Sequence, residues 1–514
     1  MTRPFLRAIG TGLAGWFVTG VLAAEPRDPE RSRDVGVALV WIFGDDDVFG
    51  APDARVPPSP AASIGDRPGY DPIGTGFRSR YTGRENRLEL RLRGAADDLI
   101  PSLSTQAELA LGVDVSSLGA RSDGASGAPI LAEDLGSFVE ARLALSRRES
   151  SSLAVRLYPI NGDFERVGWL EALGWGGATG PRRESPYATA RGAVRAGRLS
   201  LALWPFEVFA GLKTATFLEP VADAPAVEET SYGVFGGVEA RPSELVKLGV
   251  AGGYFEHGML EGAAPSVRAV TAGGSAMFSI GSGTEETRSP VAFLGPTDDP
   301  FRAVGAALPG TYVVGVETAL LVQRLVDFDR SQETTLVPAR ALALFGGARL
   351  GPFETSAAFT LRDVEFVMRD APGVFPARST PRAAQRDVER TLLLSNGWVF
   401  SELLRVDLAL GLRFPAAVMT AALDRSGRPT GATLVVNEPA DVELLPPGAV
   451  PVPIFDSRLT LEARLSRMLS TVGWLAFRRD YNRTRLVSVA GESAARGFAE
   501  PNRFGYGVAA RAVW

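Results

Sequence analysis

Apolar and polar residues alternate along many segments of this 514-residue chain. From Leu404 to Phe414 every second residue is Leu, Val or Phe, and the residues between them include Arg405, Asp407 and Arg413. The same alternation recurs at 87–93, 107–115 and 455–465. A period of two residues is that of a β-strand with one apolar and one polar face. The chain is therefore predicted to be all-β.

About eighteen segments (16–18) have this strand character. They are predicted at 35–43, 86–94, 105–115, 137–147, 151–160, 188–203, 206–217, 230–241, 245–256, 267–280, 311–325, 336–350, 353–363, 388–399, 403–414, 454–466, 470–480 and 503–514.

The links between these segments alternate in length. Short links include 242–244 and 351–352, whereas 44–85, 161–187, 364–387, 415–453 and 481–502 are long. This pattern predicts an up-and-down antiparallel barrel with short periplasmic turns and long extracellular loops. The long segment 281–310 falls on the short-turn side, which means either a misplaced strand boundary or an insertion there.

The strand lengths favour a transmembrane barrel over a soluble β-sandwich. Strands of about 9–12 residues can cross a bilayer at a tilt of roughly 45°. A soluble sandwich would have short loops at both ends. Only helices and closed barrels satisfy all backbone polar groups in lipid, and the chain after residue 24 has no apolar run long enough for a spanning helix.

The first 24 residues have the pattern of a secretory signal peptide. Arg3 and Arg7 precede the apolar stretch 8–22, and Ala23 and Ala24 stand before Glu25. We expect cleavage there and a single barrel domain over 25–514. A membrane anchor is the alternative interpretation of this stretch.

The last segment is apolar on one parity and ends with an aromatic residue. Tyr506 and Trp514 lie on that parity, separated by Val508, Ala510 and Ala512. It resembles the terminal strand of Gram-negative outer-membrane β-barrel proteins, a porin-like class that covers about 35–514 here without matching one characterised family. The resemblance implies an outer-membrane location, contact with outer-membrane lipid and lipopolysaccharide, and recognition of the terminal aromatic by the barrel-assembly machinery.

Aromatic residues near strand ends are predicted to form two girdles at the membrane interfaces, where amphipathic rings prefer to lie. They are Trp41, Phe43, Trp204, Phe206, Trp398, Phe400, Phe414, Trp474 and Tyr506.

The polar parity is expected to face a hydrated lumen, because so many charges are costly to bury dry. Barrels of 16–18 strands can hold a water-filled channel. The pore-lining candidates are Arg91, Glu108, Arg142, Arg405, Asp407, Arg413, Arg458, Glu462, Arg464 and Arg511. Further inward candidates are Arg87, Arg93, Arg156, Arg268, Arg324, Arg362, Glu89, Asp114, Glu140, Glu207, Glu239, Glu317 and Asp456.

These features predict a porin-like channel for passive diffusion of small polar solutes. A structural or adhesive barrel with a plugged lumen and an exporter of an anionic polymer are the alternatives. For any single charged residue, pairing across strands without selectivity is the simpler interpretation. The solute, the oligomeric state and the openness of the lumen stay open at this point.

Enzymatic and cofactor-dependent functions lack sequence support. The chain has no Cys and no dinucleotide, P-loop or HExxH motif, so no cofactor or metal is expected. His257 is interpreted as a surface residue, with a Ser–His hydrolase as the alternative. The acidic residues Asp45, Asp46, Asp47 and Asp53 are interpreted as a solvated loop, with calcium binding as the alternative. A net charge of −5 argues against nucleic-acid binding.

Overall fold

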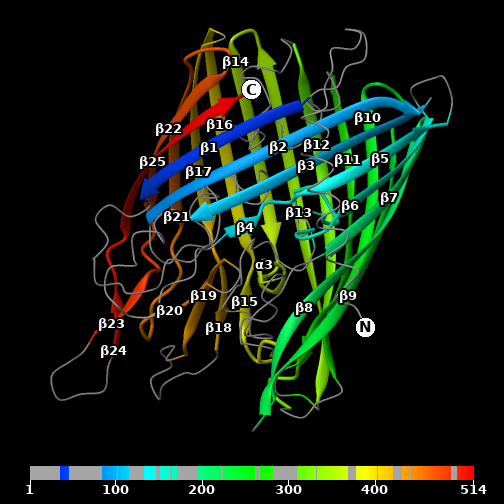
Figure 1. The fold of residues 1–514 in the computed structure, drawn as a ribbon. Coiled ribbons are helices and arrows are strands. Elements are labelled where there is room, and N and C mark those ends of the chain that lie inside the picture. The colour runs from blue at the N-terminus through cyan, green and yellow to red at the C-terminus, as the bar shows by residue number, and fades with distance from the viewer. Residues whose placement is uncertain are drawn as a thin grey trace, which may run out of the picture.

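A closed antiparallel β-barrel of eighteen strands confirms the predicted fold class. The structure is a computed structural model that describes residues 35–45, 84–100, 102–114, 132–145, 151–162, 165–170, 173, 195–221, 224–260, 263, 267–282, 310–330, 333–368, 378–401, 403–420, 431–438, 441–487 and 495–514. Figure 1 shows the strands tilted around one axis. Each of the eighteen predicted segments overlaps one barrel strand.

The barrel strands follow one another around the ring in chain order. They are β1 (Val35–Asp45), β2 (Arg84–Ile100), β3 (Leu103–Asp114), β5 (Phe138–Ala144), β6 (Ser151–Tyr158), β7 (Arg195–Leu203), β8 (Phe206–Val221), β9 (Ala224–Ala240), β10 (Val246–Met259), β11 (Arg268–Ser282), β12 (Tyr312–Val326), β13 (Thr334–Leu350), β14 (Phe353–Arg362), β16 (Glu389–Ser401), β17 (Leu404–Phe414), β21 (Ile454–Arg464), β22 (Leu469–Arg479) and β25 (Asn502–Val513). The short β4 (Ala132–Asp134) continues the line of β5 along β3.

The first and last strands close the ring. β1 pairs with β2 on one side and with β25 on the other, with Ala38 opposite Val513. The backbone N–H of Trp514 donates to the carbonyl oxygen of Val37 at 2.8 Å, and the Val37 N–H donates to the Trp514 carbonyl at 3.0 Å. Closure leaves no unpaired sheet edge, which is the condition for a sheet that stands in lipid.

The two rims of the barrel differ as predicted for most links. The strand bounds show two exceptions: β11 ends at Ser282 and β12 begins at Tyr312, which leaves a long link on the side of the short turns, and only two residues separate β8 from β9 on the other side. Short turns join β2 to β3, β7 to β8, β13 to β14 and β21 to β22 on one rim. On the other rim, long segments join β6 to β7, β14 to β16 and β17 to β21. We call them the short-turn rim and the long-loop rim. The long-loop rim lies in the lower part of Figure 1.

The alternation in sequence becomes two faces of the sheet. In β17 the residues Asp407, Ala409 and Arg413 are buried toward the interior, whereas Leu412 and Phe414 are exposed on the outside. The predicted orientation of apolar side chains outward and polar side chains inward is therefore observed in this strand. An apolar outer band is what a barrel needs in a bilayer.

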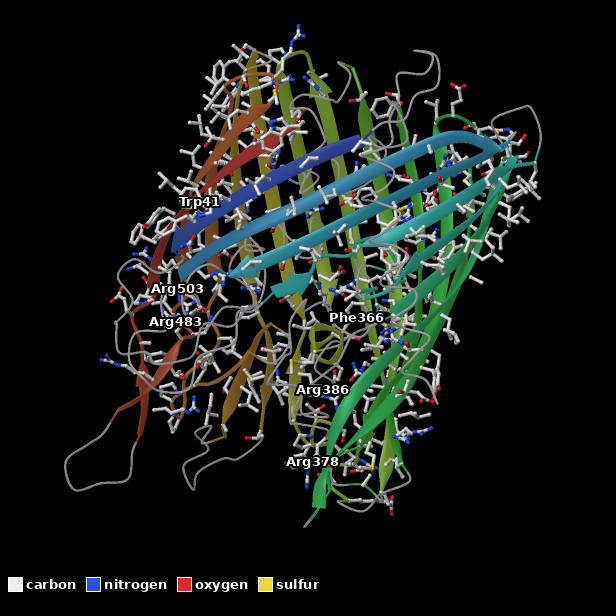
Figure 2. All side chains as sticks on the ribbon, viewed as in Figure 1. Trp41, Phe366, Arg378, Arg386, Arg483 and Arg503 are labelled. Atoms are coloured by element: carbon white, nitrogen blue, oxygen red, sulfur yellow. The ribbon has the colours of Figure 1, made fainter. Side chains whose placement is uncertain are left out.

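Aromatic side chains occupy the outer face near both rims. Phe353 and Trp398 lie near the short-turn rim with ring centroids 5.7 Å apart. Phe43 and Tyr506 lie near the long-loop rim at 6.3 Å, and Trp41, at the edge of the barrel in Figure 2, donates its indole N–H to Asn86 at 2.8 Å.

The prediction that Trp474 belongs to these girdles is wrong. Its side chain is 6% exposed and packs with Val40, Ile42, Val472 and Ala509 on the inner face. The parity of β22 explains this, because Leu475 is the exposed neighbour. Gly507, opposite Trp474, has no side chain and so leaves room for the indole ring.

Additional elements lie at the long-loop rim. The helix α3 (Val364–Val367) follows β14, and a four-stranded sheet combines β15 (Gln385–Asp387), β18 (Ala416–Met419), β19 (Thr433–Glu438) and β20 (Asp441–Leu444). Val364, Val367, Val418 and Val436 share one apolar cluster, which joins the helix to the sheet. A separate hairpin pairs β23 (Thr484–Val487) with β24 (Ala495–Phe498). None of the helices in the described ranges has the length and hydropathy for a membrane span.

Several predictions fall on residues outside the described ranges. These are the signal peptide at 1–24, most of the segment 281–310, and Asp46, Asp47 and Asp53.

Candidate functional site: the inner face of the barrel

Charged side chains line the inner face near the short-turn rim, on β2, β3 and the strands that follow. Glu108 accepts a hydrogen bond from Arg93 Nε at 2.8 Å and lies 3.4 Å from Arg91 Nη1. On the next hairpin, Glu140 accepts from Arg156 Nε at 2.6 Å and from Arg142 Nη2 at 3.1 Å. Arginine forms strong charge-assisted hydrogen bonds with carboxylates, so each hairpin carries its own ion-pair group.

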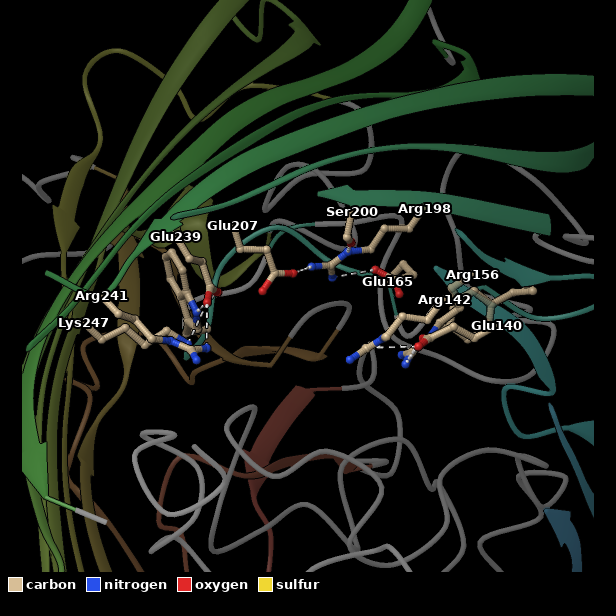
Figure 3. Close-up of polar contacts among 12 residues, drawn as sticks. Glu140, Arg142, Arg156, Glu165, Arg198, Ser200, Glu207, Glu239, Arg241 and Lys247 are labelled. Atoms are coloured by element: carbon tan, nitrogen blue, oxygen red, sulfur yellow. Dashed lines mark hydrogen bonds and ion pairs between the residues drawn. The ribbon is translucent and has the colours of Figure 1, made fainter. Parts of the chain in front are cut away.

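The charged band continues across β7 to β10 (Figure 3). Arg198 lies 3.4 Å from Glu165 and 3.5 Å from Glu207. Glu239 contacts Lys247 Nζ at 2.9 Å. Glu165 belongs to the segment between β6 and β7 rather than to a barrel strand, so Arg198 ties that segment to the wall.

A second part of the band lies on β13, β14, β16 and β17. Arg405 Nη2 contacts Glu354 Oε2 at 2.7 Å and Asp407 Oδ1 at 2.8 Å, and Arg349 lies 3.5 Å from Glu354. On β21 and β25, Glu462 lies 3.6 Å from Arg511. The inner face is therefore a chain of alternating charges rather than a field of one sign.

The two parts of the band differ in access to water. On the β5 to β8 side, the side chains of Arg142, Arg156 and Glu207 are 54%, 35% and 33% exposed. On the β13 to β14 side, the Arg349 and Glu354 side chains are almost completely buried. Solvent inside the barrel thus reaches mainly the wall from β2 to β8.

The inner face of β8 to β14 is apolar near its middle. Phe209, Phe235, Phe255 and Leu321 form one buried cluster with Val167 and Leu173 of the segment between β6 and β7. A second cluster adds Leu170, Met277 and Phe345. The expectation of a charged, hydrated wall all around the lumen is wrong for these strands, because an inward segment covers their inner face and excludes water there.

A buried carboxylate holds this inward segment. Glu317 on β12 accepts hydrogen bonds from the backbone N–H groups of Trp169 at 2.9 Å and Leu170 at 2.5 Å. Glu317 is completely buried. Two backbone donors aimed at one carboxylate compensate part of the cost of burying its charge.

Helix α3 closes the apolar region from the long-loop side. Phe366 belongs to the same cluster as Val167 and Leu321, and Figure 2 places it within the outline of the barrel. The next residue back, Glu365, accepts from Thr380 Oγ1 at 2.7 Å and pairs with Arg386 at 3.0 Å. These contacts fix the helix against the segment that carries β15.

The ten predicted pore-lining residues all lie on the inward parity of their strands. The structure places Arg91 and Glu108 in one group, Arg142 in the next, and Arg405, Asp407, Glu462 and Arg511 around the β13 to β25 wall. Arg464 lies near the β21–β22 turn, where Nε donates to the Ser466 carbonyl at 3.3 Å. Arg413 and Arg458 are buried. Among those that form an ion pair, Arg142 has the most exposed side chain.

Two other predicted placements are wrong. Arg324 faces outward, because it lies seven residues after the inward Glu317 and therefore has the opposite parity, and its cross-strand partner Leu336 is exposed. His257 is a buried residue rather than a surface residue, and its Nε2 lies 2.9 Å from Thr271 Oγ1.

Within the described ranges, no group of three or more His, Asp or Glu side chains is arranged to hold a metal ion. Asp45 is the last residue of β1, and its acidic neighbours lie outside those ranges.

Some residues of this site were missed at the sequence level. Arg198 and Ser200 could have been found, since they alternate with the outward Leu199 and Leu201 of β7. Glu165, Trp169 and Phe366 come from segments without alternation, so no periodicity marks them as inward.

Comparisons with known proteins find only distant structural resemblances. No protein-family model matches the chain, and no curated protein matches it. Solved structures that resemble it are outer-membrane proteins of Pseudomonas aeruginosa. OpdK, whose crystal structure contains vanillate, is 11% identical with a TM-score of 0.44, covering 93% of this chain and 98% of that chain. OccK8 (OprE) is 9% identical with a TM-score of 0.46, covering 94% and 98%. Resemblances at this level assign no function to this chain.

Proposed function

We propose that this chain is a porin-like channel of a bacterial outer membrane that lets small polar solutes diffuse through its lumen. The observation that carries the proposal is the partly exposed set of charged side chains inside a closed barrel, on the wall from β2 to β8. Arg142, Arg156 and Glu207 all keep a third or more of their side-chain surface open to solvent. Charges in this position are hydrated.

The proposed path follows this charged wall. The opposite wall is covered by the inward segment around Trp169 and by Phe366. The path is thus narrower than the full barrel, and the ion-pair groups beside it set which solutes pass. In this proposal the ten predicted pore-lining residues divide by access to water, with the exposed Arg142 beside the path and the buried Glu108, Arg413 and Arg458 within the wall.

Of the alternatives, the structural or adhesive barrel has one observation in its favour. The sheet of β15, β18, β19 and β20 provides an additional folded surface at the long-loop rim, where a surface partner would bind. An exporter of an anionic polymer would need unpaired arginines along one path. Arg93, Arg156 and Arg405 instead pair with carboxylates, which favours the small-solute channel over the exporter.

Conductance of the folded protein in a planar bilayer tests the proposal. We expect discrete ionic steps, and we expect the double variant Arg142→Glu with Arg156→Glu to shift the reversal potential toward cation preference in a salt gradient. Arg340→Glu, on the outer face, is the matched control and should leave the reversal potential unchanged. A folded barrel that never conducts would refute the channel and leave the structural alternative.

A further inference from the structure

Arginines on the outer face of the barrel occur at the long-loop rim. Cross-strand register identifies them, because directly opposed residues share a face of the sheet. Arg324 lies opposite Leu336, Arg340 opposite Leu320, and Arg390 opposite Phe414, and all three partners are exposed apolar residues of the outer face. Arg195 on β7 and Arg479 on β22 also face outward, because Arg195 is exposed on the same parity as Leu199 and Leu203, and Arg479 lies opposite the exposed Phe455.

The opposite rim has a different character. Among the side chains that the structure describes, outward residues at the short-turn ends of the strands are uncharged and mostly apolar or aromatic, such as Leu203, Phe206, Tyr312, Leu350, Phe353, Phe400 and Leu469. The outer face is therefore polarised, with charged groups, among them these arginines and Glu256, at one membrane boundary and apolar groups at the other.

The spacing between the two boundaries fits one bilayer. Arg390 lies eight residues before Trp398 on β16, and Arg340 lies ten residues before Leu350 on β13. At about 3.4 Å per residue these spans are roughly 27 and 34 Å along the strand. A tilt of about 40° reduces them to roughly 21 and 26 Å, close to the ~25 Å apolar band of outer-membrane barrels. Arg340 and Arg390 thus lie at the level of lipid headgroups, and Arg324, which is opposite Leu336, lies farther toward the long-loop rim.

Of these outward arginines, Arg324, Arg340 and Arg390 lie on the strands nearest to one another. They stand on β12, β13 and β16, within a width of four adjacent strands, where neighbouring strands are about 4.8 Å apart. The Arg340 side chain is 78% exposed, and its Nε lies 3.5 Å from Asp363 Oδ2. Since a guanidinium has five N–H donors, this one contact leaves donors directed to the surroundings.

Exposed apolar side chains lie beside these arginines. Leu320, four residues before Arg324 on β12, and Leu392, two residues after Arg390 on β16, lie on their membrane side, and Leu336 lies directly opposite Arg324. Leu320 and Leu336 are each 61% exposed. A cation at the boundary next to an apolar surface below it matches an amphiphile whose anionic head meets arginine and whose acyl chains cover leucine. A free anion without acyl chains would make no apolar contact with these leucines.

We propose that Arg324, Arg340 and Arg390 form an external binding site for a phosphate-bearing lipid of the leaflet at the long-loop rim. The planar guanidinium donates two parallel hydrogen bonds to a phosphate, which favours arginine for this task. The chain's lipid-facing arginines therefore select one leaflet, and they help to set the orientation and depth of the barrel. The site does not depend on an open lumen.

Binding of diphosphorylated lipid A to the purified, folded protein tests this site. Lipid adducts are counted by native mass spectrometry across a lipid titration, with dephosphorylated lipid A and inorganic phosphate as separate probes. We expect saturable adducts with diphosphorylated lipid A, and at least tenfold weaker binding in the triple variant Arg324→Gln, Arg340→Gln, Arg390→Gln. Arg330→Gln, at an exposed arginine in the β12–β13 link, is the matched control and should bind like the unmodified protein.

Three outcomes would overturn the site. They are equal binding by the triple variant and the unmodified protein, equal binding of phosphorylated and dephosphorylated lipid, and displacement of the lipid by millimolar inorganic phosphate. If the triple variant fails to fold, Arg340→Gln alone is measured and should weaken binding at least threefold. Conductance of the triple variant should stay unchanged, so a failure of this site is distinguishable from a failure of the channel.

Discussion

Replacing Leu410 with arginine tests which face of the barrel meets lipid. Leu410 on β17 pairs with Leu394 on β16. Leu394 lies four residues from Trp398, near the short-turn rim, and four residues from Arg390, near the long-loop rim, so Leu410 stands halfway across the apolar band. An arginine on the lipid face at mid-bilayer costs about 2–4 kcal/mol, which is roughly a 30- to 700-fold change in the folding equilibrium.

Urea unfolding of the barrel in lipid vesicles, followed by tryptophan fluorescence, measures this cost. Leu410→Met keeps the face apolar and should change the free energy of unfolding by less than about 1 kcal/mol. Gln106→Arg places the same charge on the inner face opposite Glu140, where we expect a change within about 0.5 kcal/mol. If the two arginine variants lose the same stability, or if Leu410→Arg loses none, the assignment of the faces is incorrect.

Three further predictions concern the interior and the long-loop rim. Gly507→Val overfills the space of the Trp474 ring and should lower the free energy of unfolding by about 1–3 kcal/mol. Gly473→Ala, on the open outer face, should leave the free energy of unfolding nearly unchanged, and equal effects of the two variants would contradict the packing described. Glu317→Gln weakens the charge-assisted hydrogen bonds to Trp169 and Leu170, together about 1.5–3 kcal/mol, so trypsin cleavage after Arg166 should accelerate about tenfold or more, and an unchanged cleavage rate would show that Glu317 does not hold the segment. Burial alone would raise the pKa of Asp327, but the backbone N–H of Asp329 and the Arg382 guanidinium lower it below its usual value. The stability that the ionised Asp327 carboxylate contributes is therefore fully present above about pH 4 and is lost as the pH falls through the lowered pKa. Hydrogen exchange of the Asp329 and Arg330 amides, relative to intrinsic rates, should accelerate only below that range, and acceleration already at pH 5 to 6 would contradict the shift.

The barrel was predictable because each strand carries its own signal. In β17 and β21 the alternation of leucine with charged residues fixes both the strand and its two faces. The turns then follow from the gaps between alternating segments. The local pattern is enough to predict such a fold, since every strand has one face toward lipid and the other toward the interior.

The apolar inner wall was not predicted, although its strands show a trace of it. In β9 both Val234 and Phe235 are apolar, so the alternation weakens where a second layer covers the inner face. That covering layer comes from the segment around Trp169, and a non-periodic segment gives no indication of which strand it will meet. The contact between Glu317 and Leu170 joins residues 147 positions apart in the sequence, so only the folded structure brings it to view.

The misplacement of Trp474 has a related cause. An aromatic residue near a strand end suits either a membrane interface or an interior space. The deciding feature is Gly507 on the neighbouring strand, and strand register cannot be obtained from the alternation within one strand alone.

Single-cysteine labelling along β2 tests the central claim most directly, since the chain has no Cys of its own. The variants Leu90→Cys, Arg91→Cys, Leu92→Cys and Arg93→Cys are folded into lipid vesicles and treated with a charged, water-soluble thiol reagent. We predict fast labelling at 91 and 93, whose arginines are partly exposed on the inner face. We predict protection at 90 and 92, with labelling there by a lipid-soluble maleimide. Uniform labelling, or fast labelling at 90 and 92 with protection at 91 and 93, would contradict an apolar outer face and a hydrated interior.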